Sequence, residues 1–297
     1  MYPSNNLSVL PFYTDIRWQN HRRSYAYGEI YPLIAEANKL LPFQIIRPHR
    51  ENEIERVELF RKDGSLFADI TQPMIETGLR VMQYRPFVND DTILYAGTLP
   101  MAINMPDGIY YVVISDGVGT WYSEMFTVVQ DVSGYVKVEW YDTEDLLMDG
   151  NVGIVYTDDD TVTPCFRNRV YLCTEIGKPE YTFSEEVNER DGYSFPEKQV
   201  SEKTYRCTIL APEYLLDAMR FVRLSDFVQV TDQRGQTYNC DTFLFTPTWQ
   251  TQGDLASVEI EFQTNTAVKR IGWGYSTANK GDFNNDYNTD FNNENNG

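Results

Sequence analysis

Any chemistry performed by this chain would depend mainly on carboxylates, because it holds 44 Asp and Glu residues but only 2 His. Two carboxylates that flank a glycosidic bond can hydrolyse it when their spacing is right. Two histidines offer few possibilities for imidazole-based catalysis. The sequence has neither a Gly-rich phosphate loop nor a serine nucleophile elbow. Since acidic side chains mostly lie at protein surfaces, we expect no enzymatic activity, with a glycan hydrolase as an open alternative.

Some residues could bind a metal, but their spacing fits no known site. Asp158, Asp159 and Asp160 lack the Gly-containing spacing of a calcium loop, which favours a solvated acidic turn. No C-x-x-C pair occurs among the four cysteines, Cys165, Cys173, Cys207 and Cys240. We expect reduced, buried thiols, no metal and no cofactor. One disulfide stays open, because spacing alone does not choose partners.

Two carboxylates occupy regular positions near the end of the chain. Glu259 and Glu261 alternate with three apolar residues, Val258, Ile260 and Phe262. This period of two is typical of a strand with one buried and one wet face. The pattern predicts an acidic row, Glu259 and Glu261, which could line a channel.

Residues 175–203 form the most unusual internal stretch. They are rich in Glu and Lys and contain four spaced aromatic residues, Tyr181, Phe183, Tyr193 and Phe195. Structureless segments of this length are uncommon within compact domains and are usually functional or disordered. The regular placement of the aromatic residues favours an extended hairpin that packs on another subunit, so these four residues are candidate interface residues.

The C-terminal end repeats a four-residue unit, Asp-Phe-Asn-Asn, from residue 282, with aromatic residues at Phe283, Tyr287 and Phe291. A helix would place like charges four residues apart, and Asn is a poor helix former. Two interpretations stay open. The segment is either a solubilising disordered tail or an arm whose three aromatic residues insert into a neighbouring subunit.

Length and composition bound the fold. A chain of 297 residues favours two domains, and an aromatic content of 14%, with 21 Tyr, favours strands. The net charge of −19 argues against gripping nucleic acid by its phosphates, but suits a surface that DNA passes without adhering. No apolar run reaches the roughly 18 residues of a membrane helix. The first residues lack the pattern of a secretion signal, so we expect synthesis in a cytoplasm.

Strand patterns dominate the first half of the chain. Residues 108–129 predict a buried strand, a tight turn and a second strand. Further strands are expected at 43–47, 54–61, 66–70, 79–84 and 92–95. Short strands at this spacing are typical of an immunoglobulin-like or fibronectin-like sandwich, here residues 43–132. Residues 1–42 predict an N-terminal arm with a short helix within 30–41.

The second half predicts another β domain, residues 133–272. Pro212 and Glu213 predict the start of a short helix over 214–220. Strands at 221–231 and 236–245 are expected to pair across a tight turn. Residues 273–297 form an Asn-, Asp- and aromatic-rich C-terminal arm. The expected fold is therefore mainly β, with a sandwich followed by a tail-tube-like domain that has one short helix and one long hairpin.

Several β segments carry a resemblance to a known group. They are GIYYVV at 108–113, WYSE at 121–124, SD at 225–226, WQ at 249–250, ASVEIEF at 256–262 and KRIG at 269–272, followed by the Asp-Phe-Asn-Asn repeat. In these segments the chain resembles virion structural proteins of Bacteroides-infecting crAss-like phages. The resemblance covers about half of the chain and carries over no active-site residue. It implies a ring or tube subunit of a phage neck or tail.

The expected function is a non-enzymatic structural subunit of the virion, part of a neck or tail ring or tube through which DNA passes during ejection. The expected partners are further copies of the chain and adjacent neck or tail proteins, with DNA passing unbound and no membrane segment. A carbohydrate-binding or receptor-binding β-sandwich protein of the tail is the alternative. A closed ring needs a heterologous interface, for which the hairpin and the terminal repeat are the candidates.

Overall fold

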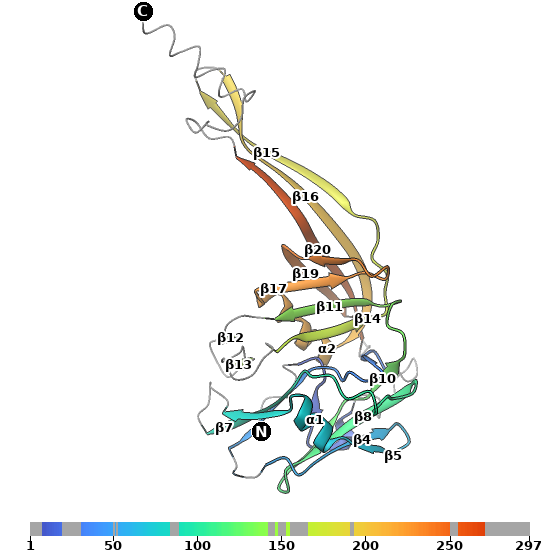
Figure 1. The fold of residues 1–297 in the computed structure, drawn as a ribbon. Helices are drawn as coiled ribbons and strands as arrows, with labels where there is room; N and C mark the ends of the chain where they lie inside the picture. The colour runs from blue at the N-terminus through green and yellow to red at the C-terminus, as the bar shows by residue number, and fades with distance from the viewer. Residues whose placement is uncertain are drawn as a thin grey trace, which may run out of the picture. The chain divides into compact units, whose positions relative to one another are not determined.

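The computed structural model describes residues 8–19, 31–49, 51, 53–83, 89–141, 146–147, 153–154, 166–190, 193–249 and 255–270. Strands dominate these residues, and two short α-helices occur among them, so the predicted mainly β fold is confirmed (Figure 1). The chain divides into two compact units: unit 1 is Met1–Lys178 with Tyr205–Thr264, and unit 2 is Pro179–Thr204 with Asn265–Gly297. The domain boundaries predicted near residues 42, 132 and 272 stay predictions. Within the described ranges, no helix is long and apolar enough to cross a bilayer.

The first half of the chain builds two sheets of unit 1. The larger sheet has the order β1-β9-β8-β10-β2, with β4 pairing with β8 and β5 pairing with β4. Its strands are β1 (Phe12–Tyr13), β2 (Ile34–Glu36), β4 (Arg56–Arg61), β5 (Leu66–Asp69), β8 (Gly108–Ser115), β9 (Thr120–Ser123) and β10 (Phe126–Val129). The smaller sheet has the order β3-β7-β6, formed by β3 (Phe43–Pro48), β7 (Asp90–Tyr95) and β6 (Arg80–Gln83). Helix α1 (Thr71–Thr77) connects β5 to β6.

This strand order is that of an immunoglobulin-like sandwich. In such sandwiches the second, fifth and fourth strands form one sheet, and the third, sixth and seventh form the other. Here β3, β7 and β6 correspond to the second, fifth and fourth strands of such a sandwich. Strands β4 and β8 and the β9–β10 segment correspond to its third, sixth and seventh strands. Strand β2 runs parallel to β10, along the edge of the larger sheet. The predicted sandwich is confirmed, with its last predicted strand divided into β9 and β10.

A tyrosine near the start of β8 holds the segment that leads into this strand. The Tyr110 hydroxyl donates to the Pro106 carbonyl at 3.1 Å, four residues upstream. Immunoglobulin-like domains place such a tyrosine two residues before a buried core position of the same strand, here Val112, which is fully buried. The sequence carries this signal as Gly-x-Tyr at 108–110, but the strand pattern alone did not single it out.

Replacing Tyr110 with Phe is expected to lower the free energy of unfolding by about 0.5–1.5 kcal/mol, because the Pro106 carbonyl loses its partner in a part-buried position. Urea unfolding of the full chain measures the change. Tyr181→Phe is the matched control, since that ring is exposed and its replacement should leave the midpoint unchanged. Equal midpoints for wild type and Tyr110→Phe would contradict a stabilising role for this hydroxyl.

The predicted helix within residues 30–41 is wrong. Strand β2 occupies the middle of this stretch, and the Thr127 amide donates to the Leu33 carbonyl at 2.8 Å. Leu33, Leu40 and Leu41 are fully buried in the sandwich, so their helix-like spacing reflects burial of an irregular strand segment. A proline also restricts the residue before it to extended backbone, which disfavours a helix that ends at Leu41.

Described residues of the predicted N-terminal arm belong to the same sandwich. Val9, Leu10 and Phe12 are buried in its core, and the Leu10 amide donates to the Pro42 carbonyl at 3.3 Å. The partners with which this stretch pairs lie far along the chain, so its own sequence shows no regular strand pattern. The sequence pattern therefore indicated a loose arm where the structure has the edge strand β1.

The second half adds two sheets of four strands each. One has the order β14-β11-β17-β18, formed by β14 (Asn168–Leu172), β11 (Val136–Tyr141), β17 (Phe227–Thr231) and β18 (Thr237–Asn239). The other has the order β15-β16-β20-β19, formed by β15 (Glu180–Arg190), β16 (Tyr193–Pro212), β20 (Leu255–Arg270) and β19 (Thr242–Trp249). Short elements complete the set: β12 (Leu146–Leu147), β13 (Gly153–Ile154), α2 (Glu213–Met219), η1 (Ile16–Trp18) and η3 (Val222–Leu224).

Helix α2 confirms the predicted short helix, which begins after Pro212 with Glu213 in its first turn. Strands β17 and β18 pair across a tight turn as predicted, but the strand predicted at 236–245 is divided between β18 and β19, which belong to different sheets. The start of the strand predicted at 221–231 is wrong, because Phe221 and Val222 are both buried and the chain there forms η3. Two consecutive buried residues suit a tight helical turn better than a strand with one wet face.

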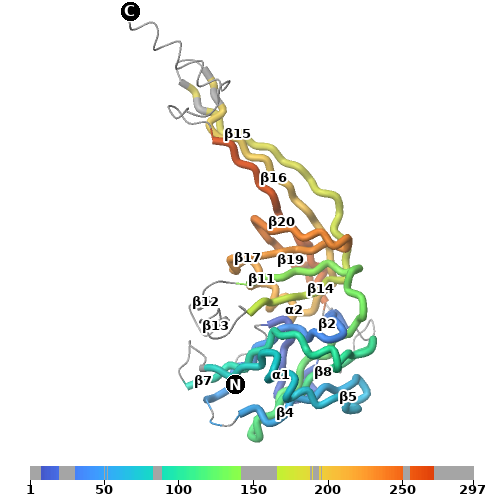
Figure 2. Tube along the Cα trace, in the orientation of Figure 1, coloured from blue at the N-terminus to red at the C-terminus, as the bar shows by residue number. Residues whose placement is uncertain are grey.

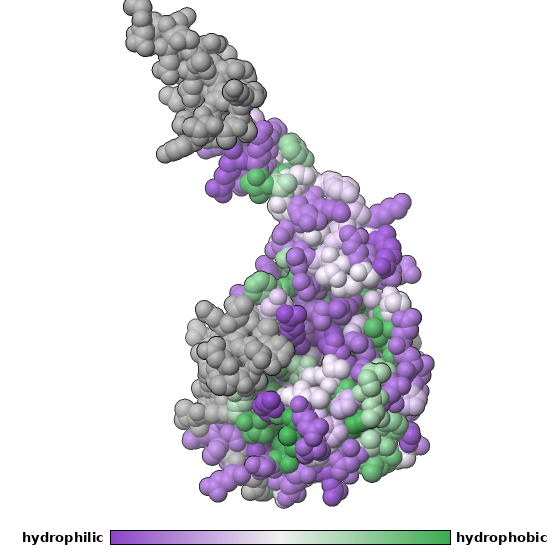
Figure 3. All heavy atoms as spheres, viewed as in Figure 1, coloured by the Kyte–Doolittle hydropathy of each residue, from purple (hydrophilic) through white to green (hydrophobic). Residues whose placement is uncertain are grey.

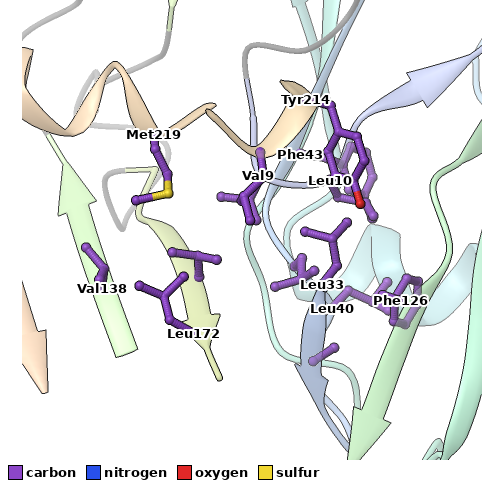
Figure 4. Packing of buried hydrophobic residues seen from close by; sticks show 14 of the residues in the cluster. Val9, Leu10, Leu33, Leu40, Phe43, Phe126, Val138, Leu172, Tyr214 and Met219 are labelled. Atoms are coloured by element: carbon purple, nitrogen blue, oxygen red, sulfur yellow. The ribbon is translucent and has the colours of Figure 1, made fainter. Parts of the chain in front are cut away.

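One continuous apolar core joins the sandwich to these second-half elements within unit 1. Figure 4 shows Val9, Leu10 and Phe43 from the first half close to Tyr214 and Met219 from the second. Polar contacts support the junction: the Arg169 Nη2 donates to the Leu40 carbonyl at 3.0 Å, and the Tyr171 hydroxyl donates to the Glu36 carboxylate. Burial is the main reason that the pKa of Tyr171 is raised, and this hydrogen bond adds to the effect.

Candidate subunit interface

The predicted hairpin at residues 175–203 is present as β15 and β16. The two strands pair antiparallel from Glu180 opposite Thr204 to Arg190 opposite Tyr193, with one irregularity between Glu186 and Val187. Figure 2 shows β15, β16 and the end of β20 running side by side. The regular placement of the aromatic residues and the length of the stretch, rather than any local turn signal, predicted this hairpin.

One side of the hairpin carries large apolar side chains in water. Alternate residues of β15 share a side, and Tyr181, Phe183 and Val187 of this row are 72%, 65% and 55% exposed. We call these three residues the hairpin face. Figure 3 shows apolar side chains between hydrophilic ones over this part of the chain. Solvent-exposed aromatic residues on a regular row mark a surface suited to a partner.

Unit 2 has no apolar core of its own among its described residues. Of these residues only Thr204 is buried, and no apolar side chain is. A single layer of strands gains stability only when one face packs against another layer or a helix. The hairpin face therefore offers apolar surface whose burial by a partner would stabilise the strands that carry it.

Polar pairs link the two strands of the hairpin. Lys198 Nζ lies 3.1 Å from a Glu186 carboxylate oxygen, and Gln199 donates to Glu185 at 2.6 Å. Thr182 donates to Glu202 at 3.1 Å across the same strands. Such exposed pairs contribute only tenths of a kcal/mol to about 1 kcal/mol each, so they set the register without replacing a core.

The other predicted interface residues have different outcomes. Strand β16 includes Tyr193 and Phe195, opposite Arg190 and Asn188 in the register, but their side chains lie outside the described part. The aromatic residues of the C-terminal repeat also lie outside the described residues: Phe283, Tyr287 and Phe291. The structure thus brings Tyr181 and Phe183 onto one row and leaves the rest of the predicted interface as a prediction.

The predicted acidic row lies on the solvent side of β20, as expected from its alternation. Val258, Ile260 and Phe262 are buried on the opposite side. Sequence reasoning missed a cation beside the row. Arg206 Nε of β16 lies 2.8 Å from a Glu261 oxygen and 3.9 Å from a Glu259 oxygen. The guanidinium offsets part of the charge of this row, and its role as a channel lining stays a prediction.

A buried charged cluster was also missed by sequence reasoning. Arg47, at the end of β3, forms an ion pair with Asp116, and its Nη2 lies 3.9 Å from an Asp91 oxygen. Asp91 also contacts His49 Nδ1 at 2.9 Å. Asp116 accepts backbone amides of its own turn, from Val118 and Gly119. With its guanidinium and carboxylates already paired, the arrangement holds the β8–β9 turn against the smaller sheet.

Two cysteines are poorly placed for nucleophilic chemistry. Burial raises the pKa of Cys207 to about 11, and burial together with the nearby Asp241 charge raises the pKa of Cys240 to about 12. The thiolate is the reactive form, so a raised pKa disfavours attack at neutral pH. Among the described residues, no group of three or more His, Cys, Asp or Glu side chains is arranged to hold a metal ion.

Comparisons with known proteins identify no family for this chain. No protein-family model matches the chain, and no curated protein does. Among solved structures, a chain of the crystal structure of the ZIG-8–RIG-5 IG1-IG1 heterodimer is similar, at 16% identity and a TM-score of 0.16. The match covers 38% of this chain and 93% of that chain. The strand order by itself defines the class, a mainly β protein with an immunoglobulin-like sandwich.

Proposed function

We propose that the chain is a non-enzymatic structural subunit of a phage virion. It oligomerises into part of a neck or tail ring or tube through which DNA passes. The observation that carries the oligomeric part of this proposal is the hairpin face, Tyr181, Phe183 and Val187, on strands without an apolar core among the described residues of unit 2. The resemblance of the β segments to crAss-like phage virion proteins supports the virion part.

Burial of the hairpin face on a neighbouring copy would provide the interface that a ring needs. Such an interface is heterologous, because the hairpin of one copy contacts a different surface of the next. Fully burying aromatic and aliphatic side chains of this kind contributes about 1.5–3 kcal/mol each. The face is thus suited to the centre of an interface, with the hairpin carboxylates, lysine and glutamine as a polar rim.

The charge of the chain supports passage of DNA without adhesion. A net charge of −19 repels phosphates, and like charge lowers non-specific binding. Glu259 and Glu261 contribute to this charge on an open side of β20, although Arg206 reduces the contribution. The repulsion is therefore a property of the whole assembled surface more than of this pair.

A tail module that binds carbohydrate or a receptor is the second candidate. Tyr141 and Phe227 stack with centroids 4.9 Å apart, and Arg167 covers the Tyr141 ring at 4.4 Å. Phe227 is exposed, as is Trp249 on β19. Amphipathic rings at a surface can stack on a sugar, so a glycan array with the purified chain tests this candidate directly.

Light scattering of the purified chain across a concentration series tests the oligomeric proposal. We expect wild type to form a defined high-order species and Tyr181→Ser/Phe183→Ser to give the mass of one chain, 34.5 kDa. The matched control is Leu66→Ser/Val118→Ser, which removes exposed apolar side chains of unit 1 and should keep the wild-type mass. A version ending at Gly272 separates the C-terminal arm from the hairpin. Monomers at every concentration, together with glycan binding, would favour the second candidate.

A further inference from the structure

The sheet that contains the hairpin ends in two different strands within unit 2. Strand β15 is the terminal strand on one side, because the order is β15-β16-β20-β19. On the other side, the pairing of β19 with β20 ends at Gln263, opposite Thr242. Strand β20 continues to Arg270, so residues 267–270 extend past the end of β19. Figure 1 shows this part of β20 and β15 on opposite sides of β16.

The backbone of β20 changes at the point where β19 stops. Asn265 has a φ of 58°, the only positive φ of a non-glycine residue in the described ranges. Asn adopts this left-handed conformation more readily than most residues. An isolated residue of this kind within a strand is typical of a bulge that redirects the strand. The end of β20 is therefore set apart from the β19 register, in a strand whose other neighbour in the sheet is β16.

The two terminal segments carry opposite charge. Strand β15 has the sequence EYTFSEEVNER, with four Glu and one Arg. The end of β20, residues 267–270, has the sequence AVKR, with Lys269, Arg270 and no acidic residue. Glu185, Glu189, Lys269 and Arg270 are all exposed. An exposed terminal strand is a template for pairing with another strand, and opposite charges on facing strands favour the pairing while like charges oppose it.

We propose that strand β15 of one copy pairs with the end of β20 of a second copy, so that the sheet of unit 2 continues from subunit to subunit. One chain cannot make this pairing with itself, since β16 separates the two segments. The inference rests on the proposed function, because it specifies how neighbouring subunits join. Pairing of β15 with β15 would place glutamates opposite glutamates and is disfavoured.

This pairing has the symmetry that a ring needs. The pairing uses two different surfaces, so a series of joined copies always has a free β15 at one end and a free β20 end at the other. The series closes into a ring when successive copies are related by a suitable rotation. Strand β15 also lacks two common protections of an exposed strand, since it contains no proline and no lysine.

Charge reversal on each strand tests the pairing by light scattering of the full chain. The first variant is Glu185→Lys/Glu189→Lys in β15, and the second is Lys269→Glu/Arg270→Glu in β20. Each alone is expected to have the mass of one chain, because the two strands then carry like charge. An equal mixture of the two variants should assemble again above the mass of one chain, since each basic strand then faces an acidic one where the two variants alternate. A chain with all four changes should regain the wild-type mass.

Controls separate this inference from the proposed function. Glu53→Lys/Glu76→Lys changes two exposed acids of unit 1 by the same charge and should leave the wild-type mass intact, and circular dichroism should show every variant folded. If both reversals keep the wild-type mass, or the mixture stays monomeric, the strand pairing is wrong while the oligomer stands. If wild type itself is monomeric at every concentration, the proposed function is wrong and the pairing fails with it.

Discussion

Replacing Arg47 with Met is expected to lower the free energy of unfolding by about 3–5 kcal/mol, the cost of leaving one partner of a buried ion pair alone. The side chains of Arg47 and Asp116 are both buried, at 1% and 0% exposure. Removing the guanidinium leaves the Asp116 carboxylate in a site from which water is excluded. Asp91, 3.9 Å from Arg47 in the folded chain, loses its cation as well.

The loss of stability in Arg47→Met should extend to the β8–β9 turn. Asp116 accepts the amides of Val118 and Gly119 at 3.1 Å and 2.7 Å, so a change in its charge or position affects the whole turn. Gly117 in this turn has a φ of 77°, a conformation that favours glycine. The ion pair thus holds the β8–β9 turn in a backbone conformation that few other residues than glycine could adopt at position 117.

Denaturant unfolding of the full chain measures the effect of Arg47→Met. Arg56→Met is the matched control, because Arg56 forms an exposed pair with Glu58 at 3.5 Å. Exposed pairs contribute about 0–1 kcal/mol, so the control should unfold close to wild type. Similar midpoints for the two variants would show that Arg47 contributes no more than a surface arginine, contrary to the buried geometry.

Periodicity predicted the parts of this fold whose residues alternate. Strands β4, β10 and β11 and the acidic row on β20 follow a period of two, because their two faces meet different surroundings. Strands β3, β7 and β8 are instead buried along most of their length and were predicted as apolar runs bounded by turn residues. The same rule failed between residues 30 and 41, where Leu33, Leu40 and Leu41 are buried by segments far along the chain. Spacing alone does not separate a short helix from an irregular strand segment with all sides covered.

Partners distant in sequence account for the features that no pattern revealed. Arg47 and Asp116 are 69 residues apart, and Arg206 lies 55 residues from Glu261. Neither pair has a local signature, since each member is an ordinary charged residue of a strand or turn. For the same reason the hairpin and the strand at β20 were each predictable, whereas the pairing of β20 with the hairpin was not.

Trp140→Ala is expected to destabilise unit 1 as a whole by about 3–5 kcal/mol, the usual cost of emptying a buried tryptophan site. Trp140 lies in β11, opposite Asn168 of β14 and Val228 of β17, and is 1% exposed. It belongs to the apolar core that also contains residues of the sandwich, such as Phe43 and Phe126. A cavity at Trp140 therefore weakens packing that both halves share.

Because both halves share this core, the unfolding curves of Trp140→Ala should show whether they unfold together. Trp121, on β9 of the sandwich, is buried. It reports on that half by fluorescence in a chain whose Trp18, Trp249 and Trp273 are replaced by Phe, while circular dichroism reports on all strands. With one cooperative core, both probes should give the same lowered midpoint. Trp249→Ala, an exposed tryptophan on β19, is the control and should change stability by less than about 0.5 kcal/mol. A Trp121 transition that keeps its wild-type midpoint would instead show that the sandwich folds independently, which is the outcome that a domain boundary near residue 132 requires.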